Sequence, residues 1–600
     1  MVGTYFPVAG KGSRNWMTTN IDYSEFEAGR HVNYWRLDRT IQREAAAVYP
    51  PDAYEWAVDH LDEFGELIGH TIADNADVID QHGPELFTYD AHGELYNHVE
   101  YHPLQIENER LVYERGIVAD CFTPPAGRDE PMPFSHNLVM QYLLSYADPG
   151  FDCPVAMTTG VALVLERFGD DRLAEAFEGL TARSYDELIE GAMFLTEKQG
   201  GSDVGANETV SRFDGATGTW RLYGEKWFCS NIDAEGTLAL ARTPDAPEGT
   251  DGLSMFYVPH TTEAGDLNQQ IYRRLKDKLG TISVPTGEVE FTGAKAYLVG
   301  EEAEGFKQMA EMLNLERLSN AAASCGIMGR ALLESKIHAA DREAFGRRLD
   351  QHPLMRVDLV DMAVDHEAAT SFTFEAARVF SSRETARRRG ESDDDDYRLM
   401  RVLIPVAKAR TARMAVATAS YAMEIQGGNG YVRDFVTHRL LRDAQVLPIW
   451  EGTENILSLD VLRAFNREGS HRTLLDWLDE RHDEIDHPLL SDELEVVRTT
   501  REQLEAHIAS LMDDPAGAQR VSKRLLNDIF EMVTATMLLD RAQTRLTSVN
   551  DAREVALTRR FIDRHLKPES TDVYTDGDQF AETYFDTIVR FAPLDPAEIG

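Results

Sequence analysis

The apolar residues of this chain change their spacing twice, and this change constrains the fold more than any other feature of the sequence. From about Ile21 to Thr181 they recur every three or four residues, the period of an amphipathic helix. Between Phe194 and Gly300 the segments are short, rich in β-branched and aromatic residues, and bounded by turn residues, which is typical of strands. After Gly305 the helical period returns. The pattern predicts an α, β, α order.

The expected fold class is α+β and mainly α. With 600 residues, 43% of them hydrophobic, the chain can form several cores. We expect a helical domain at 1–190, a β-domain at 191–300, a helical bundle at 301–470 and a helical extension at 471–600, interrupted by a polar break near Pro568 to Asp578. The expected helices are Ala53–Ile79, Pro154–Phe168, Phe306–Ala344, Pro353–Arg388, Tyr397–Gly427 and Asn455–Phe465. The expected strands are Thr219–Ser230, Thr237–Arg242, Leu253–Val258 and Glu288–Phe291.

The net charge argues against one class of partner. The chain carries 103 Asp and Glu against 60 Lys and Arg, a formal net charge of −43. Because nonspecific DNA binding depends on cations that neutralise phosphates, this charge argues against a nucleic-acid partner. A dense acidic shell also suits molar salt, where a Debye length of ~3 Å screens the self-repulsion. Halophilic origin is therefore a hypothesis.

The sequence predicts a cytoplasmic protein without a membrane partner. Met1 to Asn20 contain no apolar signal-peptide core, and no later stretch approaches the ~20 apolar residues of a membrane span. The cysteines are far apart and show no paired spacing, so we expect free thiols and no metal site. They are Cys121, Cys153, Cys229 and Cys325.

A turn with two adjacent glycines, Gly200 and Gly201, lies between Thr196 and Ser202, where helix gives way to strand. Such glycines allow backbone amides to approach a phosphate or a ring carbonyl, and the hydroxyls can add directed hydrogen bonds. A purely structural turn is the commoner explanation of such a sequence.

The strand that follows carries an aromatic residue beside a hydroxyl. Alternation places Phe228 and Ser230 on one face and Trp227 and Cys229 on the other. Such a pair can flank a flat heterocycle and hydrogen-bond to its edge. Core packing explains it equally well, so this strand is a weak indication by itself.

Glu451 is the most informative acidic residue. It lies in an apolar stretch and precedes Gly452, which leaves its carboxylate unobstructed for a ligand. Desolvation of a carboxylic acid favours its use as a general base. Upstream, Gly427 and Gly428 end a long helix, usually as a C-cap.

The joint order of these motifs resembles the acyl-CoA dehydrogenase family over roughly Gly191 to Phe465. The motifs follow one another as in that family: first the turn, then the Lys-aromatic-x-Ser strand, Arg317, the Arg342 to Gly346 motif, Gly427 to Gly430 and Ile449 to Thr453. The chain is most similar to the AidB-like branch. This closer similarity rests on the Lys-Gln-Gly form of the turn, on Pro353 to Arg356, on Pro84 to Pro103 and on the long tail.

The resemblance implies a middle β-barrel, a C-terminal four-helix bundle, a homotetramer and one FAD per subunit near a dimer interface. It implies Glu451 as the catalytic residue. It places acyl-CoA near Ser202, Asn314, Arg317 and Gly452. The implied FAD contacts are Thr196, Gly201, Ser202, Phe228, Ser230, Arg342, Gly427, Gly428, Thr453 and Asn455.

The implied reaction belongs to fatty acid metabolism. Glu451 takes the α-proton of an acyl-CoA thioester while flavin N5 accepts the β-hydride, and the product is a trans-2-enoyl-CoA. An electron-transfer flavoprotein is the implied partner for reoxidation. Two alternatives remain at this point: a DNA-associated flavoprotein with vestigial dehydrogenase activity, and an acyl-CoA oxidase that passes electrons to oxygen.

Overall fold

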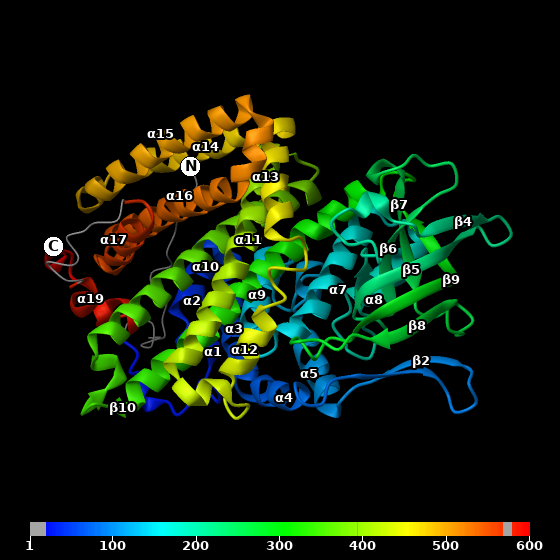
Figure 1. Ribbon diagram of the computed structural model, residues 1–600, viewed down its shortest axis with the longest axis horizontal. Coiled ribbons are helices and arrows are strands. Elements are labelled where there is room, and N and C mark those ends of the chain that lie inside the picture. Colours follow the sequence, from blue (N-terminus) through cyan, green and yellow to red (C-terminus); the bar gives the residue numbers. More distant parts are fainter. Residues whose placement is uncertain (1–19, 393, 568–578, 600) are drawn as a thin grey trace. The chain divides into compact units, whose positions relative to one another are not determined.

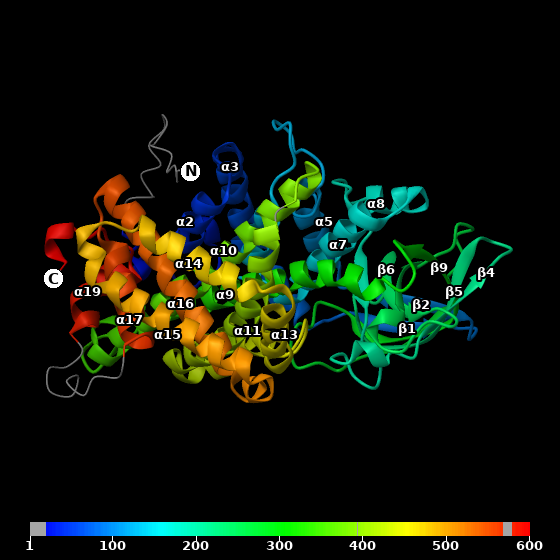
Figure 2. The same cartoon turned by 90° about the horizontal axis from the view of Figure 1, so that it is seen from above.

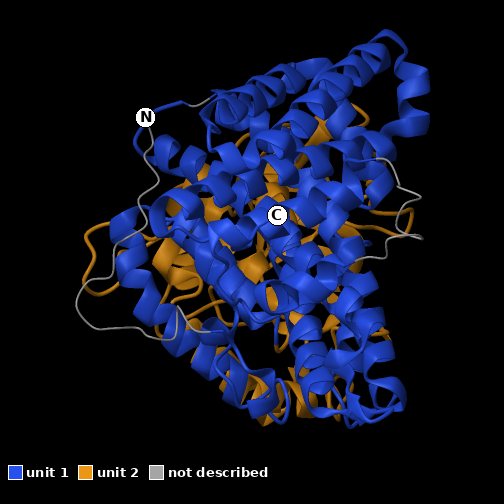
Figure 3. Cartoon of the chain, turned by 90° about the vertical axis from the view of Figure 1, so that its left-hand side faces the viewer, with its two compact units in different colours: residues 1–70, 133–146, 320–600 blue, residues 71–132, 147–319 orange. Residues whose placement is uncertain are grey.

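The computed structural model describes residues 20–392, 394–567 and 579–599. Two compact units make up the chain (Figure 3). The helical unit comprises residues 1–70, 133–146 and 320–600, and the barrel unit comprises residues 71–132 and 147–319. Residues 1–19, used in the leader prediction, and the predicted polar break at 568–578 lie outside the described residues.

The barrel unit contains a closed sheet. Hydrogen bonds connect its strands in the order β6, β4, β5, β9 and β7, and β7 pairs again with β6; β3 pairs with β6 and β8 with β9 (Figure 1). The strands are β3 (Gly191–Phe194), β4 (Val210–Asp214), β5 (Thr219–Ser230), β6 (Gly236–Arg242), β7 (Leu253–Pro259), β8 (Gln270–Leu275) and β9 (Thr286–Val299). The predicted bounds of β5 are confirmed, and those of β6 and β7 are within one residue.

Alternation along β6 explains how the barrel is filled and covered. Ala239 and Ala241 belong to one apolar core with residues such as Phe256. Leu238 and Leu240 point to the other face and pack in a second core with helix α7 (Pro149–Phe168) and the start of α9 (Gly305–Asp341). The small residues thus face one core and the large residues face the other.

A β-hairpin interrupts the predicted N-terminal helical region. Strands β1 (Glu85–Tyr89) and β2 (Leu95–Glu100) pair antiparallel. Asn97 fastens the hairpin to β8, since its amide donates to Gln270 O at 2.8 Å and its carbonyl oxygen accepts from Tyr272 N at 3.0 Å. The helical prediction is wrong here because the hairpin is stabilised by contacts with a strand far along the chain.

The remaining helices of the barrel unit are short. Asn75 on α4 donates to Asn108 on α5 at 2.7 Å, and this buried amide pair joins the two helices. These short helices are α4 (Ala73–Ile79), α5 (Pro103–Tyr113) and α8 (Ala174–Leu180).

The helical unit is built around long helices. Helix α9 begins in the barrel unit and ends in this one. The other helices are α1 (Tyr34–Leu37), α2 (Arg39–Val48), α3 (Pro51–Leu67), α6 (Phe134–Leu144), α10 (Pro353–Arg388), α11 (Asp394–Ile425), α12 (Thr437–Ala444) and α13 (Glu454–Glu468). Pro353 at the first helical position and Gly390 at φ +75° after the end agree with the predicted bounds of α10.

The C-terminal extension is helical, as predicted. Its helices are α14 (Ser470–Glu484), α15 (Ser491–Asp513), α16 (Pro515–Val549), α17 (Arg553–His565) and α19 (Phe580–Val589). Helices α14, α15 and α16 lie side by side in both views (Figure 2). Among the described residues, no helix is long and apolar enough to cross a bilayer.

Buried ion pairs join the extension to the rest of the helical unit. Arg553 on α17 pairs with Glu367 on α10, and Arg541 on α16 donates to Glu44 on α2 at 3.0 Å. Arg43 also donates to Glu367, at 2.8 Å. Because these charges lie in the interior, the extension and the bundle share one core.

Candidate active site

Two glycines shape the turn between β3 and β4. Gly200 has φ +126°, a conformation that side chains with a Cβ rarely adopt, and a Cβ on Gly201 would lie 2.6 Å from Thr196 Oγ1. Gly201 and Ser202 are exposed. The structure therefore brings Thr196 next to Gly201 and leaves the tip of the turn open to a ligand.

A buried ion pair ties this turn to β5. Lys226 Nζ donates to Glu197 Oε1 at 2.7 Å and to Leu240 O at 3.0 Å. The Thr209 hydroxyl and the Glu208 amide each donate to the same carboxylate at 2.6 Å. Burial lowers the pKa of Lys226. Burial also raises the pKa of Glu197, but the charge of Lys226 together with the hydrogen bonds from Lys226, Thr209 and Glu208 outweighs it, and the net shift is downward. Glu197 therefore stays ionised and links the turn to β5 and to the segment that precedes β4.

A β-bulge corrects the predicted alternation of β5. The register with β9 shifts between Lys226 and Cys229, and both of these side chains are buried. The two residues between them therefore lie outside the core: Phe228 is 55% exposed and Trp227 is half-buried. The prediction that Trp227 shares a face with Cys229 is wrong, because the bulge inserts an extra residue into the strand.

Ser230 lies beside residues that the sequence did not single out. Its Oγ is 3.0 Å from Thr286 Oγ1, and Lys278 Nζ donates to that hydroxyl at 3.3 Å. Lys278 also donates to the Thr281 and Val284 carbonyls at 2.6 and 2.5 Å. The Ser230 and Thr286 positions are 56 residues apart and meet only through the β5–β9 pairing, so no local signal could have identified them.

Asn314 and Arg317 lie one turn apart on α9, within the barrel unit. Asn314 is buried and Arg317 is half-buried. Their spacing of three residues puts them on one helix face. Glu311 fixes this part of α9, since it forms an ion pair with Arg167 at 2.7 Å.

Glu451 has a strained backbone in the helical unit. Its φ is +55°, and that of Gly452 is +100°. The left-handed conformation costs a non-glycine residue about 1–3 kcal/mol and is concentrated at functional sites. Buried Lys408 holds the turn by donating to Gly452 O at 2.6 Å. The fold thus places a half-buried glutamate in a turn whose backbone is held in place.

The helix after this turn carries the next two predicted residues. Thr453 is the N-cap of α13 and makes no side-chain cap hydrogen bond, and Asn455 is exposed. The neighbouring Glu454 lies 3.7 Å from both Arg413 Nε and Lys523 Nζ. These two cations engage Glu454, so it is a weaker candidate for a base than Glu451.

Arg342 begins a tight hairpin after α9. Strands β10 (Glu343–Ala344) and β11 (Arg347–Arg348) pair across Phe345 and Gly346, whose φ angles of +52° and +82° are those of a type I′ turn. The Arg342 amide donates to His338 O at 2.9 Å. Its side chain is exposed.

Gly427 and Gly428 follow α11 and leave open space above their backbone. Gly427 has φ +60°, so it ends the helix as predicted. A Cβ on either glycine would meet no atom of the described residues within 4 Å. Both are exposed and available to a ligand or to another chain.

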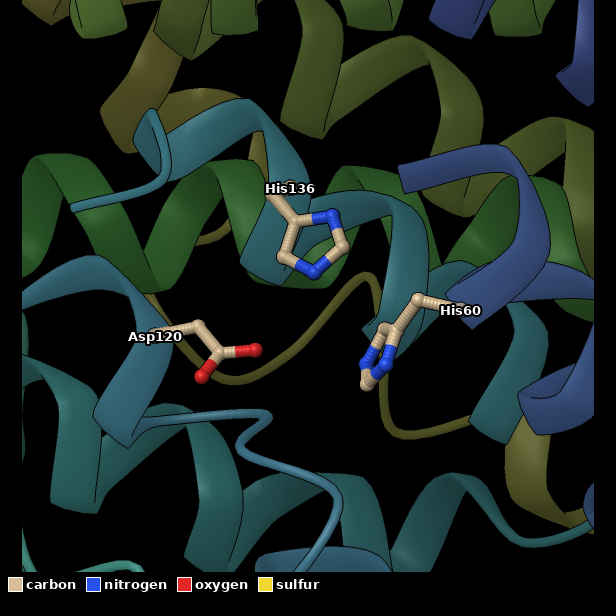
Figure 4. Close-up of side chains that lie close together, drawn as sticks. All are labelled: His60, Asp120 and His136. Atoms are coloured by element: carbon tan, nitrogen blue, oxygen red, sulfur yellow. The ribbon is translucent and has the colours of Figure 1, made fainter. Parts of the chain in front are cut away.

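His60 and His136 form a cluster outside the predicted site (Figure 4). In the helical unit the rings of His60 and His136 are 5.5 Å apart, and Tyr49 Oη lies 3.0 Å from His136 Nδ1. Asp120, also drawn in Figure 4, belongs to the barrel unit, where it pairs with Arg183. Burial raises the pKa of Asp120 to about 6. We assign these groups no part in the reaction.

The predicted site residues divide between the two units. The barrel unit holds Thr196, Gly201, Ser202, Phe228, Ser230, Asn314 and Arg317. The helical unit holds Arg342, Gly427, Gly428, Glu451, Gly452, Thr453 and Asn455.

Three family models match successive parts of the chain. They are "Adaptive response protein AidB N-terminal domain" at residues 26–187, "Acyl-CoA dehydrogenase, middle domain" at 192–294, and "Acyl-CoA dehydrogenase, C-terminal domain" at 303–465. With the barrel between helical segments, these matches define the acyl-CoA dehydrogenase fold.

Relatives and solved structures agree with this class. Acyl-CoA dehydrogenase family member 11 of Caenorhabditis elegans is 32% identical over 87% of this chain and 85% of its own length. The putative acyl-CoA dehydrogenase AidB of Escherichia coli strain K12 is 32% identical over 70% and 76%. The crystal structure of Caenorhabditis elegans ACDH-11 in complex with C11-CoA has a TM-score of 0.83 at 28% identity, covering 94% of this chain and 95% of that one.

The chain therefore belongs to the acyl-CoA dehydrogenase family, in its AidB-like branch, and is an oxidoreductase that acts on acyl-CoA. An acyl-CoA dehydrogenase of Bacillus anthracis complexed with FAD shares the fold, with a TM-score of 0.70 at 17% identity over 95% of this chain and 96% of that one.

Proposed function

We propose that this protein dehydrogenates an acyl-CoA thioester to a trans-2-enoyl-CoA with Glu451 as the base. The strained φ of +55° at Glu451 carries the proposal, because strained conformations of this kind are concentrated at functional sites. Lys408 holds the carbonyl of the next residue, so the backbone from which the carboxylate projects has little freedom. A positioned base of this kind typically contributes ~10²–10⁴ in rate.

The residues of both units suit FAD. The exposed turn at Gly201 and Ser202 can offer amides and a hydroxyl to an anion or a ring edge, and Gly427 and Gly428 leave room for close approach. Phe228 presents an exposed ring, and Ser230 follows two residues later on β5. Arg342, Thr453 and Asn455 complete the proposed cofactor contacts. When bound, FAD supplies the acceptor for the β-hydride of the substrate.

The proposed substrate contacts are Ser202, Asn314, Arg317 and Gly452. Arg317 is the cation of this group and suits the phosphates of a coenzyme A ester. The complex of Caenorhabditis elegans ACDH-11 with C11-CoA supports an acyl-CoA ligand for this chain as well.

Assembly as a homotetramer is part of the proposal. Four large apolar side chains of the helical unit are 65–97% exposed, and contacts between subunits would remove them from water. They are Phe345, Leu354, Tyr431 and Ile449. We propose a cytoplasmic location, an electron-transfer flavoprotein as the acceptor, and adaptation of the acidic surface to high salt. Full stability in dilute buffer would contradict the last of these.

Anaerobic bleaching of the flavin by a panel of acyl-CoAs tests the function. We expect stoichiometric FAD in the purified protein and rapid bleaching by at least one chain length. A protein that binds FAD but is bleached by no acyl-CoA, while dithionite reduces it normally, would disprove the proposed reaction. Peroxide formation in air at the rate of turnover would instead identify an acyl-CoA oxidase.

A DNA-associated flavoprotein, the alternative implied by the resemblance to the AidB-like branch, is the second candidate. The net charge of −43 opposes it, since each phosphate contact requires a cation. We expect negligible binding of duplex DNA at physiological salt. Salt-sensitive micromolar binding in a mobility-shift assay would favour this candidate.

A further inference from the structure

We propose that Trp227 is a positioning residue that holds the turn Thr196 to Ser202 in its cofactor-binding conformation through Lys198 and Lys276. The inference rests on the proposed function of that turn. It assigns a role to a residue that regular alternation would bury, and the bulge of β5 is what brings Trp227 to the outer side of the barrel unit.

Two lysines lie over the Trp227 ring. Lys276 Nζ is 3.4 Å from the ring centroid, and Lys198 Nζ is 5.4 Å from it. Lys276 also lies 5.0 Å from the centroid of Phe228, so one ammonium group bridges two adjacent aromatic rings. These distances fall within the ~6 Å range of cation–π attraction.

The two lysines belong to different segments. Lys198 lies in the turn itself, whereas Lys276 follows β8, where Glu288 accepts from its Nζ at 2.6 Å. The side chain of Lys276 is only 12% exposed and that of Glu288 only 9%. A cation–π contact strengthens when water is excluded, so the Lys276 contact fixes the Trp227 ring against the barrel.

Trp227 attaches the turn to β5 through two contacts. The Trp227 amide donates to Thr196 O at 2.9 Å, and the Trp227 ring holds Lys198. Glu225 completes the attachment, since it pairs with Lys198 at 2.6 Å. The side-chain amide of Gln199 also donates to the Asn207 side chain at 3.0 Å, which holds the tip at another point.

Loss of the ring should therefore loosen the tip without unfolding the barrel. The buried pair of Glu197 and Lys226 anchors the base of the turn independently. Gly201 and Ser202, at the exposed tip, would sample more conformations, and ordering them again on FAD binding would weaken affinity. Loss of the ring removes the exposed contact with Lys198 and the desolvated contact with Lys276, and together they correspond to roughly a tenfold loss.

The test compares Trp227→Leu, Trp227→Tyr and Lys198→Met with the parent protein. Hydrogen exchange of the peptide Thr196 to Asp203 is measured by mass spectrometry in the flavin-free protein, and the Kd for FAD is measured by fluorescence titration. Lys295→Met is the matched control, because Lys295 lies 5.4 Å from the Tyr297 ring on another part of the same unit.

We expect Trp227→Leu to exchange faster in this peptide and to bind FAD about tenfold more weakly. Trp227→Tyr keeps an aromatic face, so its hydrogen exchange and its affinity for FAD should be close to those of the parent. Lys198→Met should lose less affinity for FAD than Trp227→Leu. Lys295→Met should match the parent.

Hydrogen exchange like that of the parent in both Trp227→Leu and Lys198→Met would overturn the inference. Equal losses of FAD affinity in Trp227→Leu and Trp227→Tyr would also overturn it. If Trp227→Leu does not fold, the exposed Lys198 still decides the question. A parent protein that takes up no FAD would contradict the proposed function, whereas the exchange experiment needs no flavin and still tests the inference.

Discussion

Lys226 and Glu197 form an ion pair inside the barrel unit, 29 residues apart in the sequence and 2.7 Å apart in the structure. Removal of one partner from a buried pair leaves the other charge uncompensated, which typically costs about 3–5 kcal/mol. The two partners differ in their other contacts. Without Lys226, the Glu197 carboxylate keeps donors from Thr209 and Glu208. Without a charged Glu197, the Lys226 ammonium keeps the Leu240 carbonyl.

We therefore expect Glu197→Gln to destabilise the protein by about 3–5 kcal/mol and Lys226→Met by roughly half as much. The free energy of unfolding from urea titrations measures both. Lys307→Met removes an exposed pair with Glu304 and should cause no measurable change. A larger loss in Lys226→Met than in Glu197→Gln would show that the other donors to Glu197 contribute little.

Glu451→Gln should keep the fold and the bound FAD but abolish flavin reduction by acyl-CoA. The substitution is nearly isosteric, yet an amide cannot accept the α-proton, so the rate should fall by at least ~10²–10⁴. Stopped-flow absorbance measures the reduction, and normal reduction by dithionite is the internal check. Glu454→Gln should behave like the parent, because Glu454 is engaged by Arg413 and Lys523. If Glu454→Gln lost the reaction and Glu451→Gln kept it, the roles would be reversed.

A group of carboxyls in the barrel unit makes its stability depend on pH. Tyr185 donates to Glu109 at 2.7 Å, and Tyr101 donates to Asp233 at 2.7 Å. Burial, reinforced by the neighbouring Asp233 carboxylate, raises the pKa of Glu109 to about 7; burial raises that of Asp233 to about 6. Between pH 4.5 and 7 the folded state thus binds more protons than the unfolded state, and stability falls as pH rises.

Glu109→Gln should remove much of this dependence. The variant should be more stable than the parent at pH 8 by about 1–2 kcal/mol, a figure reduced for the partial exposure of the side chain, and should differ little near pH 5. Urea unfolding at both pH values measures the difference. A pH dependence as steep as that of the parent would exclude Glu109 as its source.

Lys336 is buried beside a small cavity of the helical unit. The cavity measures about 30 Å³, and its lining includes Asp38, His366 and Tyr23. Lys336 Nζ donates to Tyr23 Oη at 3.4 Å. Burial lowers the pKa of Lys336 to about 8, so between pH 8 and about 10 the unfolded state binds the extra proton and stability rises with pH.

Lys336→Met should stabilise the protein at pH 7. The gain from avoiding a buried charge exceeds the loss of the weak Tyr23 contact, for a net effect on the order of 1 kcal/mol. Urea unfolding at pH 7 and pH 10 measures it, and the difference between variant and parent should shrink at the higher pH. A destabilised variant at pH 7 would mean that the ammonium contributes more through its partners than burial costs.

Local patterns in the sequence determined the long elements and the order of the layers. The bounds of α10 and β5 follow from periodicity and from capping and turn residues, which act within a few positions. The turn at Gly200 and Gly201 and the acidic residue at Glu451 were also recognisable, because their composition is unusual where they occur.

Only the tertiary structure decided how the candidate site is held. The bulge that turns Trp227 outward depends on the pairing of β5 with β9, and the contact of Ser230 with Thr286 crosses that same pairing. The Lys226 to Glu197 pair, the Lys408 to Gly452 bond and the positive φ of Glu451 likewise depend on neighbours brought together by packing. Spacing along the chain specifies which face a residue prefers, but register and burial are set by partners tens of residues away, and no local pattern encodes them.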